Sequence, residues 1–391
     1  MPPQMFDQKR FLMIPGPTPV PESILLSLAK HPLPHRSPEF SEILLDCNEG
    51  LNKVARTKEA MPIIYASSGT GGMEAILANL LTPGEKVLSI INGVFGKRWA
   101  DMAALFGADV QRINVEPGQA VKLEDLQKAL DEDKNKEIKL VLVTFSETST
   151  GAVNPLKEIC SLIRKHENTK SALIAVDAIT GLGAMPLEMD EWGIDALVSG
   201  SQKGFMIPPG LSFVWVGERA WEAHQKSKFP RFYWDWTKAK KALDDKTTAF
   251  TPNVTFIVAL QEALRLINDE GIENTWKRHA RLRDCTRESV KAMGLQTFTN
   301  DESASAAITS ILPPANVSVN DIRKKLKNDW QIVVADGQNE LKGKIFRIGH
   351  LGFVNDRDVL TALNALSCVL KDLGHDPGTS WHEEYNRVLK G

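Results

Sequence analysis

The sequence predicts an α/β protein with a wound, mainly parallel sheet, followed by a smaller C-terminal α+β domain. Short apolar segments alternate with amphipathic helical patterns over roughly 200 residues, as expected of a parallel sheet. Runs such as KLVLVTF and ALIAVD are apolar on both faces, which is typical of strands buried between two helix layers. Past residue 260 the pattern changes to long helices with a few short strands.

The elements follow one another in a regular order. After a proline-rich start, Ser37 can cap a helix, Pro38 suits its first turn and Glu39 complements the positive end of its dipole. Seven strands are expected, at residues 63–66, 86–91, 109–113, 139–145, 172–177, 196–199 and 212–216. Helical patterns between them cover residues 73–81, 96–106 and 156–166.

The second half of the chain predicts a separate, smaller domain. Helical patterns at 258–270 and 275–293 lead into short strands near 307–311, 332–334 and 345–348, and helical periodicity returns at 356–373. We therefore expect an N-terminal segment over residues 1–20, a large domain over 21–260 and a small domain over 261–391.

Composition excludes several classes of partner. With 42% hydrophobic residues, 25% charged residues and a net charge of -2, the chain is typical of a soluble globular protein. It has no block of like charge that would favour nucleic acid or an anionic membrane. It also shows no signal peptide and no apolar stretch of about twenty residues, so we expect a cytoplasmic protein. The four cysteines form no CxxC pair, so no metal site is expected.

A glycine-rich loop follows the first of the seven strands. Residues 67–72 read SSGTGG and open a helix, where free amides and the helix dipole favour an anion. Ser68 and Thr70 add hydroxyl donors beside Gly69. The loop matches neither a Walker sequence nor GxGxxG, so it is either a phosphate site or a turn without a ligand.

Two charged residues follow later strands. Asp177 comes after five apolar residues, where a charge is costly unless it is paired. It is either a partner for a protonated ring nitrogen or a helix cap. Lys203 lies between a buried strand and a loop rich in glycine and proline. That position suits an amine that forms an imine with an aldehyde.

Three further residues have weaker signals. Ser149, in the segment TFSETSTG, can bond a phenolic oxygen or a phosphate, or simply belong to a polar turn. Phe95, flanked by glycines, can stack on a planar ring or pack in the core. Arg347 interrupts an apolar run, and is either a clamp for a carboxylate or an arginine on an exposed strand face. Together, an anion cradle, a buried carboxylate, a lysine, an aromatic ring and a carboxylate clamp match pyridoxal phosphate bound to an amino acid.

The chain resembles the class V, fold type I aminotransferases, and among them the alanine/serine–glyoxylate (serine–pyruvate) group. The resemblance covers about residues 10 to 375. It is carried by motifs that include SSGTGGMEA, NGVFGKR, SETSTG, VDAITGLGA, SGSQKGFMIPPG and FRIGHLG. Some cyanobacterial members of this group are labelled soluble hydrogenase small subunit.

The resemblance implies a role for each matching position. Lys203 would form a Schiff base with pyridoxal 5'-phosphate and shuttle the proton, and Asp177 would pair with the ring nitrogen. Arg347 would bind the substrate carboxylate, and Gly16 would lie in an N-terminal segment that covers the active site. The remaining cofactor contacts would come from Ser68, Gly69, Thr70, Phe95, Ser149, Ile179 and Gln202, and from Thr251 of a second subunit.

The implied activity is ping-pong transfer of an amino group from alanine or serine to glyoxylate or pyruvate in a homodimer with shared active sites. Two departures from the family are Phe95, where tryptophan is frequent, and Thr248, where many members carry tyrosine. Two alternatives remain: an accessory subunit of a redox (hydrogenase) complex, and a lyase or desulfurase of the same fold. The second needs a mobile cysteine, and none lies between Cys285 and Cys368.

Overall fold

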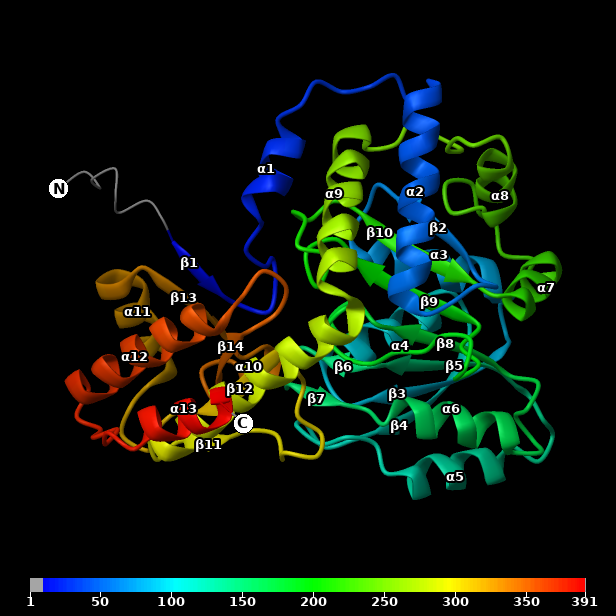
Figure 1. Ribbon diagram of the computed structural model, residues 1–391. Helices are drawn as coiled ribbons and strands as arrows, with labels where there is room; N and C mark the ends of the chain where they lie inside the picture. Colours follow the sequence, from blue (N-terminus) through cyan, green and yellow to red (C-terminus); the bar gives the residue numbers. More distant parts are fainter. Residues whose placement is uncertain (1–9, 391) are drawn as a thin grey trace.

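The computed structural model describes residues 10–390 of the chain. Within that range it contains a sheet of seven strands and a sheet of five strands, each with its own helices. The unit around the larger sheet lies at the right of Figure 1 and the smaller unit at the left, with α10 running between them. The sequence therefore predicted the fold class correctly.

The larger sheet has the strand order β2-β10-β9-β8-β5-β3-β4. Strand β10 is antiparallel to both of its neighbours, and all pairs from β9 to β4 are parallel. The mainly parallel sheet is thus confirmed, with each strand within two residues of its expected range. The strands are β2 (Met61–Tyr65), β3 (Lys86–Ile91), β4 (Asp109–Asn114), β5 (Ile138–Thr144), β8 (Leu173–Asp177), β9 (Ala196–Gly200) and β10 (Ser212–Val216).

Helices cover both faces of this sheet because its strands are apolar on both faces. In β5, Leu140 and Leu142 belong to one core, whereas Val141 and Val143 belong to the other. The first face is covered by α3 (Gly69–Leu80), α4 (Val94–Leu105), α7 (Glu218–Lys226) and α8 (Trp236–Asp244). The second is covered by α2 (Pro38–Ala55), α5 (Leu123–Glu132), α6 (Leu156–Lys165) and α9 (Val254–Glu270), and α1 (Glu22–Leu28) packs on α9.

The smaller sheet has the order β1-β13-β14-β12-β11 and is covered by helices on one face. In β14, Phe346 and Ile348 point into the core of this unit, so Arg347 between them points to the opposite face. The strands are β1 (Phe11–Met13), β11 (Gln296–Thr297), β12 (Ile308–Leu312), β13 (Ile332–Asp336) and β14 (Phe346–Gly349). The helices are α10 (Ile272–Ala292), α11 (Val319–Trp330), α12 (Asp356–Asp372) and α13 (Trp381–Lys390).

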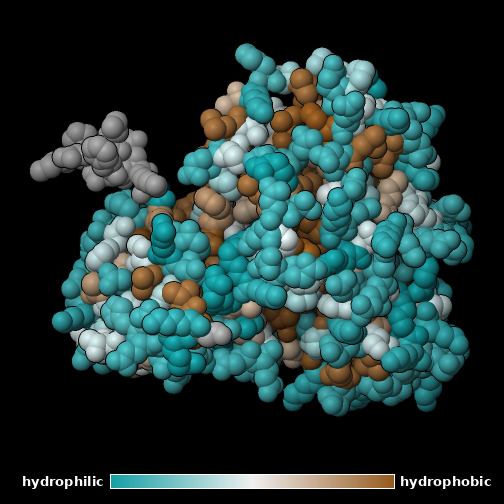
Figure 2. Space-filling model, viewed as in Figure 1, coloured by the Kyte–Doolittle hydropathy of each residue, from teal (hydrophilic) through white to brown (hydrophobic). Residues whose placement is uncertain are grey.

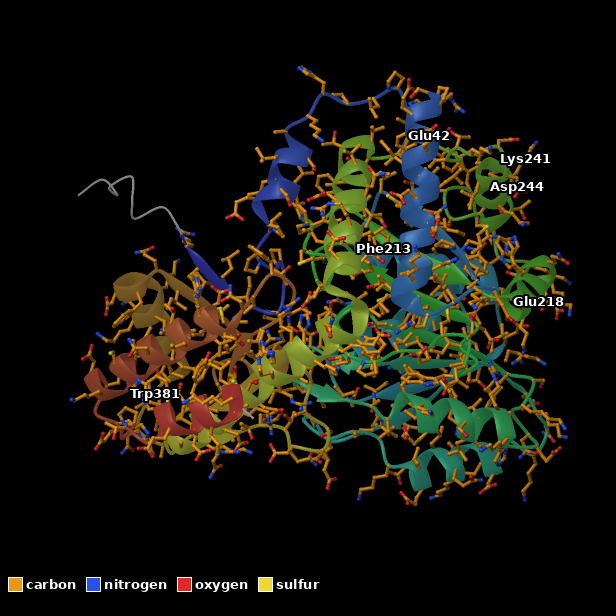
Figure 3. The ribbon with its side chains drawn as sticks, in the orientation of Figure 1. Glu42, Phe213, Glu218, Lys241, Asp244 and Trp381 are labelled. Atoms are coloured by element: carbon orange, nitrogen blue, oxygen red, sulfur yellow. The ribbon has the colours of Figure 1, made fainter. Side chains whose placement is uncertain are left out.

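The side chains follow this division into two cores. Figure 3 shows Phe213 inside the larger unit and Trp381 inside the smaller one, and both are buried. Glu42, Glu218 and Asp244 lie on outer faces of helices and are exposed. No helix within residues 10–390 is long and apolar enough to cross a membrane.

The expected domain boundaries remain predictions, and two elements do not follow them. Strand β1 belongs to the smaller sheet, where it pairs with β13, although it lies near the start of the chain. Helix α9 extends past residue 260 while it packs on α2 of the larger unit. Residues 1–9 of the expected N-terminal segment lie outside the described part of the chain.

The predicted helix start at Ser37 is confirmed, because its side chain accepts the amide of Phe40.

Candidate active site

The polar groups that follow the strands of the larger sheet meet at one edge. Strands β2, β5, β8 and β9 point in one direction, so their carboxyl ends lie together. At the end of β9, Gly200 lies so close to Gly69 that a Cβ atom on Gly200 would be 3.7 Å from the Gly69 amide nitrogen. The loops after β2 and β9 are therefore in contact.

Lys203 lies just beyond the end of β9 and is only 9% exposed. Its Nζ donates a hydrogen bond to Pro15 O at 2.7 Å, and the Thr18 hydroxyl donates to Lys203 O at 3.2 Å. Gly16 lies so close that a Cβ there would be 2.8 Å from Lys203 Nζ. Burial, assisted by the positive charge of Arg347, lowers the pKa of Lys203 to about 8. A substantial fraction of this amine is therefore neutral near physiological pH.

Asp177 ends β8 and is 4% exposed. Its Oδ1 accepts the amide of Ile179 at 3.0 Å within a turn, and no α-helix begins there, so the helix-cap interpretation is wrong. Burial raises the pKa of Asp177 to about 7, and the nearby charge of Lys203 opposes that shift. A cationic partner at this carboxylate would favour its ionised form.

The glycine-rich loop forms an open helix start, that is, the first turn of α3 with amides that have no hydrogen-bond partner within residues 10–390. Ser68 is the N-cap of α3 but its side chain makes no capping hydrogen bond. In the described part of the chain, the amides of Gly69 and Thr70 likewise have no hydrogen-bond partner. A Cβ on Gly69 would lie 2.5 Å from Ile179 Cδ1, so the loop packs directly against a residue two positions after Asp177. Gln202 Oε1, from the loop that carries Lys203, is buried without a partner.

Phe95 lies at the start of α4 and is half-buried. The guanidinium of Arg98 lies over its ring, with Cζ 4.7 Å from the ring centroid. Arg98 also donates to the Thr70 hydroxyl at 3.3 Å, so a cation stands beside the open helix start. We did not expect Arg98 from the sequence, although it belongs to the motif NGVFGKR.

Arg347 reaches the site from the smaller unit. It is 4% exposed, so the interpretation as an arginine on an exposed strand face is wrong. Its Nη1 donates to Thr148 O at 2.6 Å and its Nε donates to Asp336 O at 2.8 Å. Burial lowers its pKa to about 10, which leaves it charged at neutral pH. Its Nη2 has no hydrogen bond within residues 10–390 and can donate to a ligand.

Ser149 leads to a residue that the sequence argument missed. The Ser149 hydroxyl donates to Glu147 Oε1 at 2.5 Å and accepts the amide of Val94 at 3.0 Å. Glu147 is fully buried, and burial raises its pKa. The signal was available, since a carboxylate closely follows a buried strand, as at Asp177, but only the neighbouring hydroxyls were considered.

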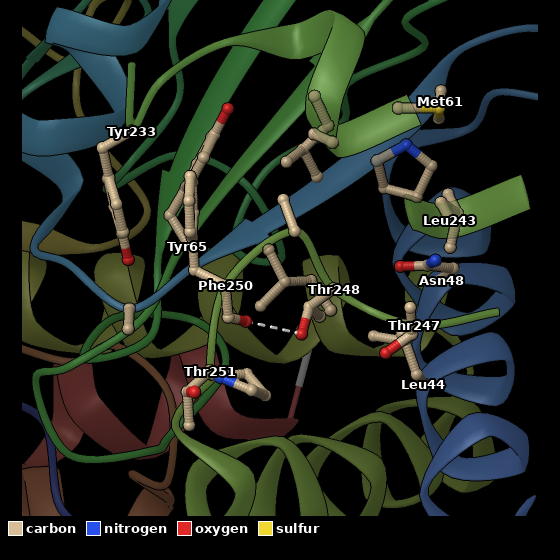
Figure 4. A pocket seen from close by; sticks show the side chains of 17 residues that line it. Leu44, Asn48, Met61, Tyr65, Tyr233, Leu243, Thr247, Thr248, Phe250 and Thr251 are labelled. Carbon is tan, nitrogen blue, oxygen red and sulfur yellow. Dashed lines mark hydrogen bonds between the residues drawn. The ribbon is translucent and has the colours of Figure 1, made fainter. Parts of the chain in front are cut away.

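Thr251 makes no hydrogen bond, within residues 10–390, to the residues around Lys203. It is exposed just before α9 and borders an apolar pocket lined by Leu44, Tyr65, Tyr233 and Phe250 (Figure 4). The Thr248 hydroxyl donates to Phe250 O at 2.8 Å, drawn as a dashed line.

The clustered residues fit pyridoxal 5'-phosphate. The open amides of α3 and the nearby Arg98 suit the phosphate, and the buried Asp177 suits a protonated ring nitrogen. Lys203 is buried, partly neutral and close enough to Asp177 to interact with its charge. In residues 10–390, no group of three or more His, Cys, Asp or Glu side chains is arranged to hold a metal ion.

Comparison with known proteins agrees with this geometry. The family model "Aminotransferase class-V" matches residues 17–350. The chain is 47% identical over 367 residues to the "Soluble hydrogenase, small subunit" of Synechococcus sp. (strain PCC 6716), with 94% of each chain covered. It is 36% identical to the L-aspartate–glyoxylate aminotransferase of Paracoccus denitrificans, covering 93% of this chain and 91% of that protein. The crystal structure of alanine–glyoxylate aminotransferase from Nostoc sp. superposes with a TM-score of 0.88 at 32% identity, covering 95% and 97% of the two chains.

Proposed function

The chain belongs to the class V aminotransferases, and from this premise we propose that it transfers the amino group of alanine or serine to glyoxylate or pyruvate. Pyridoxal 5'-phosphate is the cofactor of the family. When bound, it supplies an aldehyde carbon that takes up the amino group and a ring that accepts electrons. The observation that carries the proposal is the convergence of Lys203, Asp177 and the start of α3 at one edge of the sheet.

Each residue of the site has a task in this proposal. Lys203 Nζ would take the α-proton of the amino acid and deliver it to the cofactor carbon that receives the amino group, which its lowered pKa allows near neutral pH. Asp177 stabilises positive charge on the ring nitrogen through its buried carboxylate. The amides of Gly69 and Thr70 bind phosphate, and Arg347 binds the substrate carboxylate. The segment around Gly16 covers Lys203 and limits the access of water.

A screen of amino donors against glyoxylate and pyruvate tests the proposal. Alanine, serine and aspartate are the donors to compare, since the Nostoc and Paracoccus proteins are named for alanine and aspartate. We expect parallel lines in double-reciprocal plots, the signature of a ping-pong reaction. Protein that has no visible cofactor absorption band, and in which borohydride reduction attaches no cofactor to Lys203, would contradict the proposal.

We also propose that the protein is a cytoplasmic homodimer, with Thr251 reaching the phosphate in the partner's site. Hydrophobic side chains gather over the region of α1, α2 and α9 in Figure 2, and Leu25, Leu26 and Leu45 are exposed there, Leu26 by 70%. Exposed apolar side chains in one region mark interfaces. Sedimentation equilibrium tests the dimer: a monomeric mass for the active protein would exclude it.

A second candidate function follows from the name of the Synechococcus relative, which suggests an accessory subunit in a redox complex. The two candidates differ in what they require of Lys203. An accessory protein without catalysis keeps its role when Lys203 is replaced by alanine, whereas an aminotransferase loses turnover. Lys203→Ala is therefore compared with the wild-type protein in two assays, one of amino transfer and one of the redox complex, and the results separate the two candidates.

A further inference from the structure

Glu147 is a buried carboxylate to which the proposed function assigns no task. It ends β6 (Ser146–Glu147) and has 0% exposure. Its Oε2 accepts the amides of Phe95 and Gly96 at 3.0 and 3.1 Å, and its Oε1 accepts the amide and hydroxyl of Ser149 at 3.0 and 2.5 Å. Four donors therefore surround it. An ionised carboxylate has about four lone-pair sites, enough for all four donors, so these contacts favour the charged form that burial opposes.

The first two donors belong to the start of α4. Gly93 is the N-cap of this helix and has no side chain to cap it, so Glu147 supplies the missing acceptor and a negative charge at the positive end of the dipole. The backbone of Phe95 is fixed by this contact, and Phe95 carries the ring that faces Arg98. Glu147 thereby sets the position of an aromatic ring at the site.

The other two donors belong to Ser149. A hydroxyl has one proton to donate and two lone pairs. Ser149 gives its proton to Glu147 and accepts the amide of Val94, so a single lone pair remains. Toward a ligand, Ser149 can then only accept a hydrogen bond. This is more specific than the sequence interpretation, in which the hydroxyl could bond a phenolic oxygen or a phosphate in either direction.

The same short segment connects both units of the fold. Thr148, between Glu147 and Ser149, accepts from Arg347 through its carbonyl oxygen. Its hydroxyl is 2.6 Å from the hydroxyl of Thr180, in the loop that follows Asp177. Residues 147–149 therefore touch α4, the loop after β8 and the smaller unit, and Glu147 is the charged group that anchors them.

We propose that Glu147 is a positioning residue of the amino-transfer site. It holds the Phe95 ring through the first turn of α4 and restricts Ser149 to the role of hydrogen-bond acceptor. This inference rests on the proposed function, because it assumes that the cofactor binds between these residues. It assigns Glu147 no contact with the reacting atoms.

The test compares Glu147→Gln with Asp133→Asn. Asp133 is 1% exposed, accepts the amides of Glu137 and Ile138 and lies 3.5 Å from Lys86 Nζ, so it is a buried, hydrogen-bonded carboxylate before β5, at the opposite edge of the sheet. The readouts are the dissociation constant of the cofactor by fluorescence titration, the visible circular dichroism of the bound cofactor, and thermal unfolding of the cofactor-free protein. We expect Glu147→Gln to weaken cofactor binding at least about tenfold and to reduce the visible dichroism. Asp133→Asn should lower thermal stability alone.

A second variant keeps the proposal testable if Glu147→Gln does not fold. The backbone of Gly93 is extended, with φ at 166°, so alanine can adopt the same backbone conformation without strain. Its Cβ would lie within 2.5 Å of Glu147 Cδ and Ser149 Oγ, so Gly93→Ala displaces the carboxylate without removing its charge. We expect a similar loss of visible dichroism in Gly93→Ala.

Wild-type affinity and dichroism in both variants would overturn the role of Glu147, as would an equal loss in Asp133→Asn. Failure of the proposed function is seen separately, in wild-type protein that binds no cofactor or transfers no amino group.

Discussion

The two sheets contribute to the candidate site in different ways. The seven-stranded sheet supplies several groups at or just beyond the carboxyl ends of its strands, among them Asp177, the last residue of β8, and Lys203, in the loop after β9. The five-stranded sheet supplies Arg347 from the middle of β14. The first set follows from the direction of parallel strands, whereas Arg347 depends on how two separately packed units meet. We therefore expect substitutions in the larger unit to affect chemistry, and substitution of Arg347 to affect substrate binding.

The largest effect is expected at Lys203. Lys203→Ala removes the amine that moves the α-proton, so amino transfer should fall by at least about 10³-fold, a loss typical of an absent general base. Steady-state turnover with the best donor measures it. Lys226→Ala, on the exposed face of α7, is the matched control and should retain wild-type turnover. Residual turnover above a few per cent in Lys203→Ala would show that the lysine is not the base.

Asp177→Asn should have the next largest effect. The neutral amide keeps the shape of the side chain but no longer stabilises a cation at the ring nitrogen, which should lower kcat about 10²- to 10³-fold. Asp177→Glu retains the charge and should recover part of the rate. A variant Asp177→Asn with normal kcat would mean that this carboxylate is structural, and the larger sheet would then contribute less chemistry than we infer.

Arg347→Ala should act mainly on KM. Loss of a buried guanidinium that binds a carboxylate should reduce kcat/KM by roughly 10²-fold for both the amino acid and the 2-oxo acid. Arg323→Ala is a suitable control, since Arg323 also bonds to β13, through Val334 O and the Asp336 carboxylate. If Arg347→Ala instead lowered thermal stability and left KM unchanged, the arginine would serve only to dock the two units.

Much of the larger unit could be predicted from the sequence. Its strands are short apolar runs separated by helical patterns, so their number and limits follow from local composition. Asp177 and Lys203 could be found because burial of a charge next to an apolar strand is costly unless the charge has a partner or a function. The same reasoning would have found Glu147 if the carboxylate in SETSTG had been given the weight given to its hydroxyls.

The smaller unit was harder to predict, because its arrangement depends on contacts between residues far apart in the chain. Strand β1 pairs with β13 more than 300 residues away, and nothing in the sequence FLM indicates that partner. Arg347 could be proposed as a clamp but not placed, since its burial depends on contact with Thr148 O. Arg98 was missed because its contacts, to Thr70 and the ring of Phe95, appear only once α3 and α4 lie side by side.

The smallest expected effect is the electrostatic influence of Arg347, in the smaller unit, on the pKa of Lys203, in the larger unit. The pKa of Lys203 is lowered to about 8 by burial and by the charge of Arg347, so its neutral fraction grows as pH rises through that value. At pH 7 about a tenth of Lys203 is neutral, compared with well under 0.1% of an ordinary lysine.

In protein freed of its cofactor, the pH dependence of acylation at Lys203, followed by mass spectrometry, should therefore have its midpoint near pH 8. Arg347→Ala removes a neighbouring positive charge, which should move this midpoint to higher pH, whereas Arg98→Ala should leave it in place. An unchanged midpoint in Arg347→Ala, or an equal shift in Arg98→Ala, would mean that the smaller unit positions substrate without tuning the lysine.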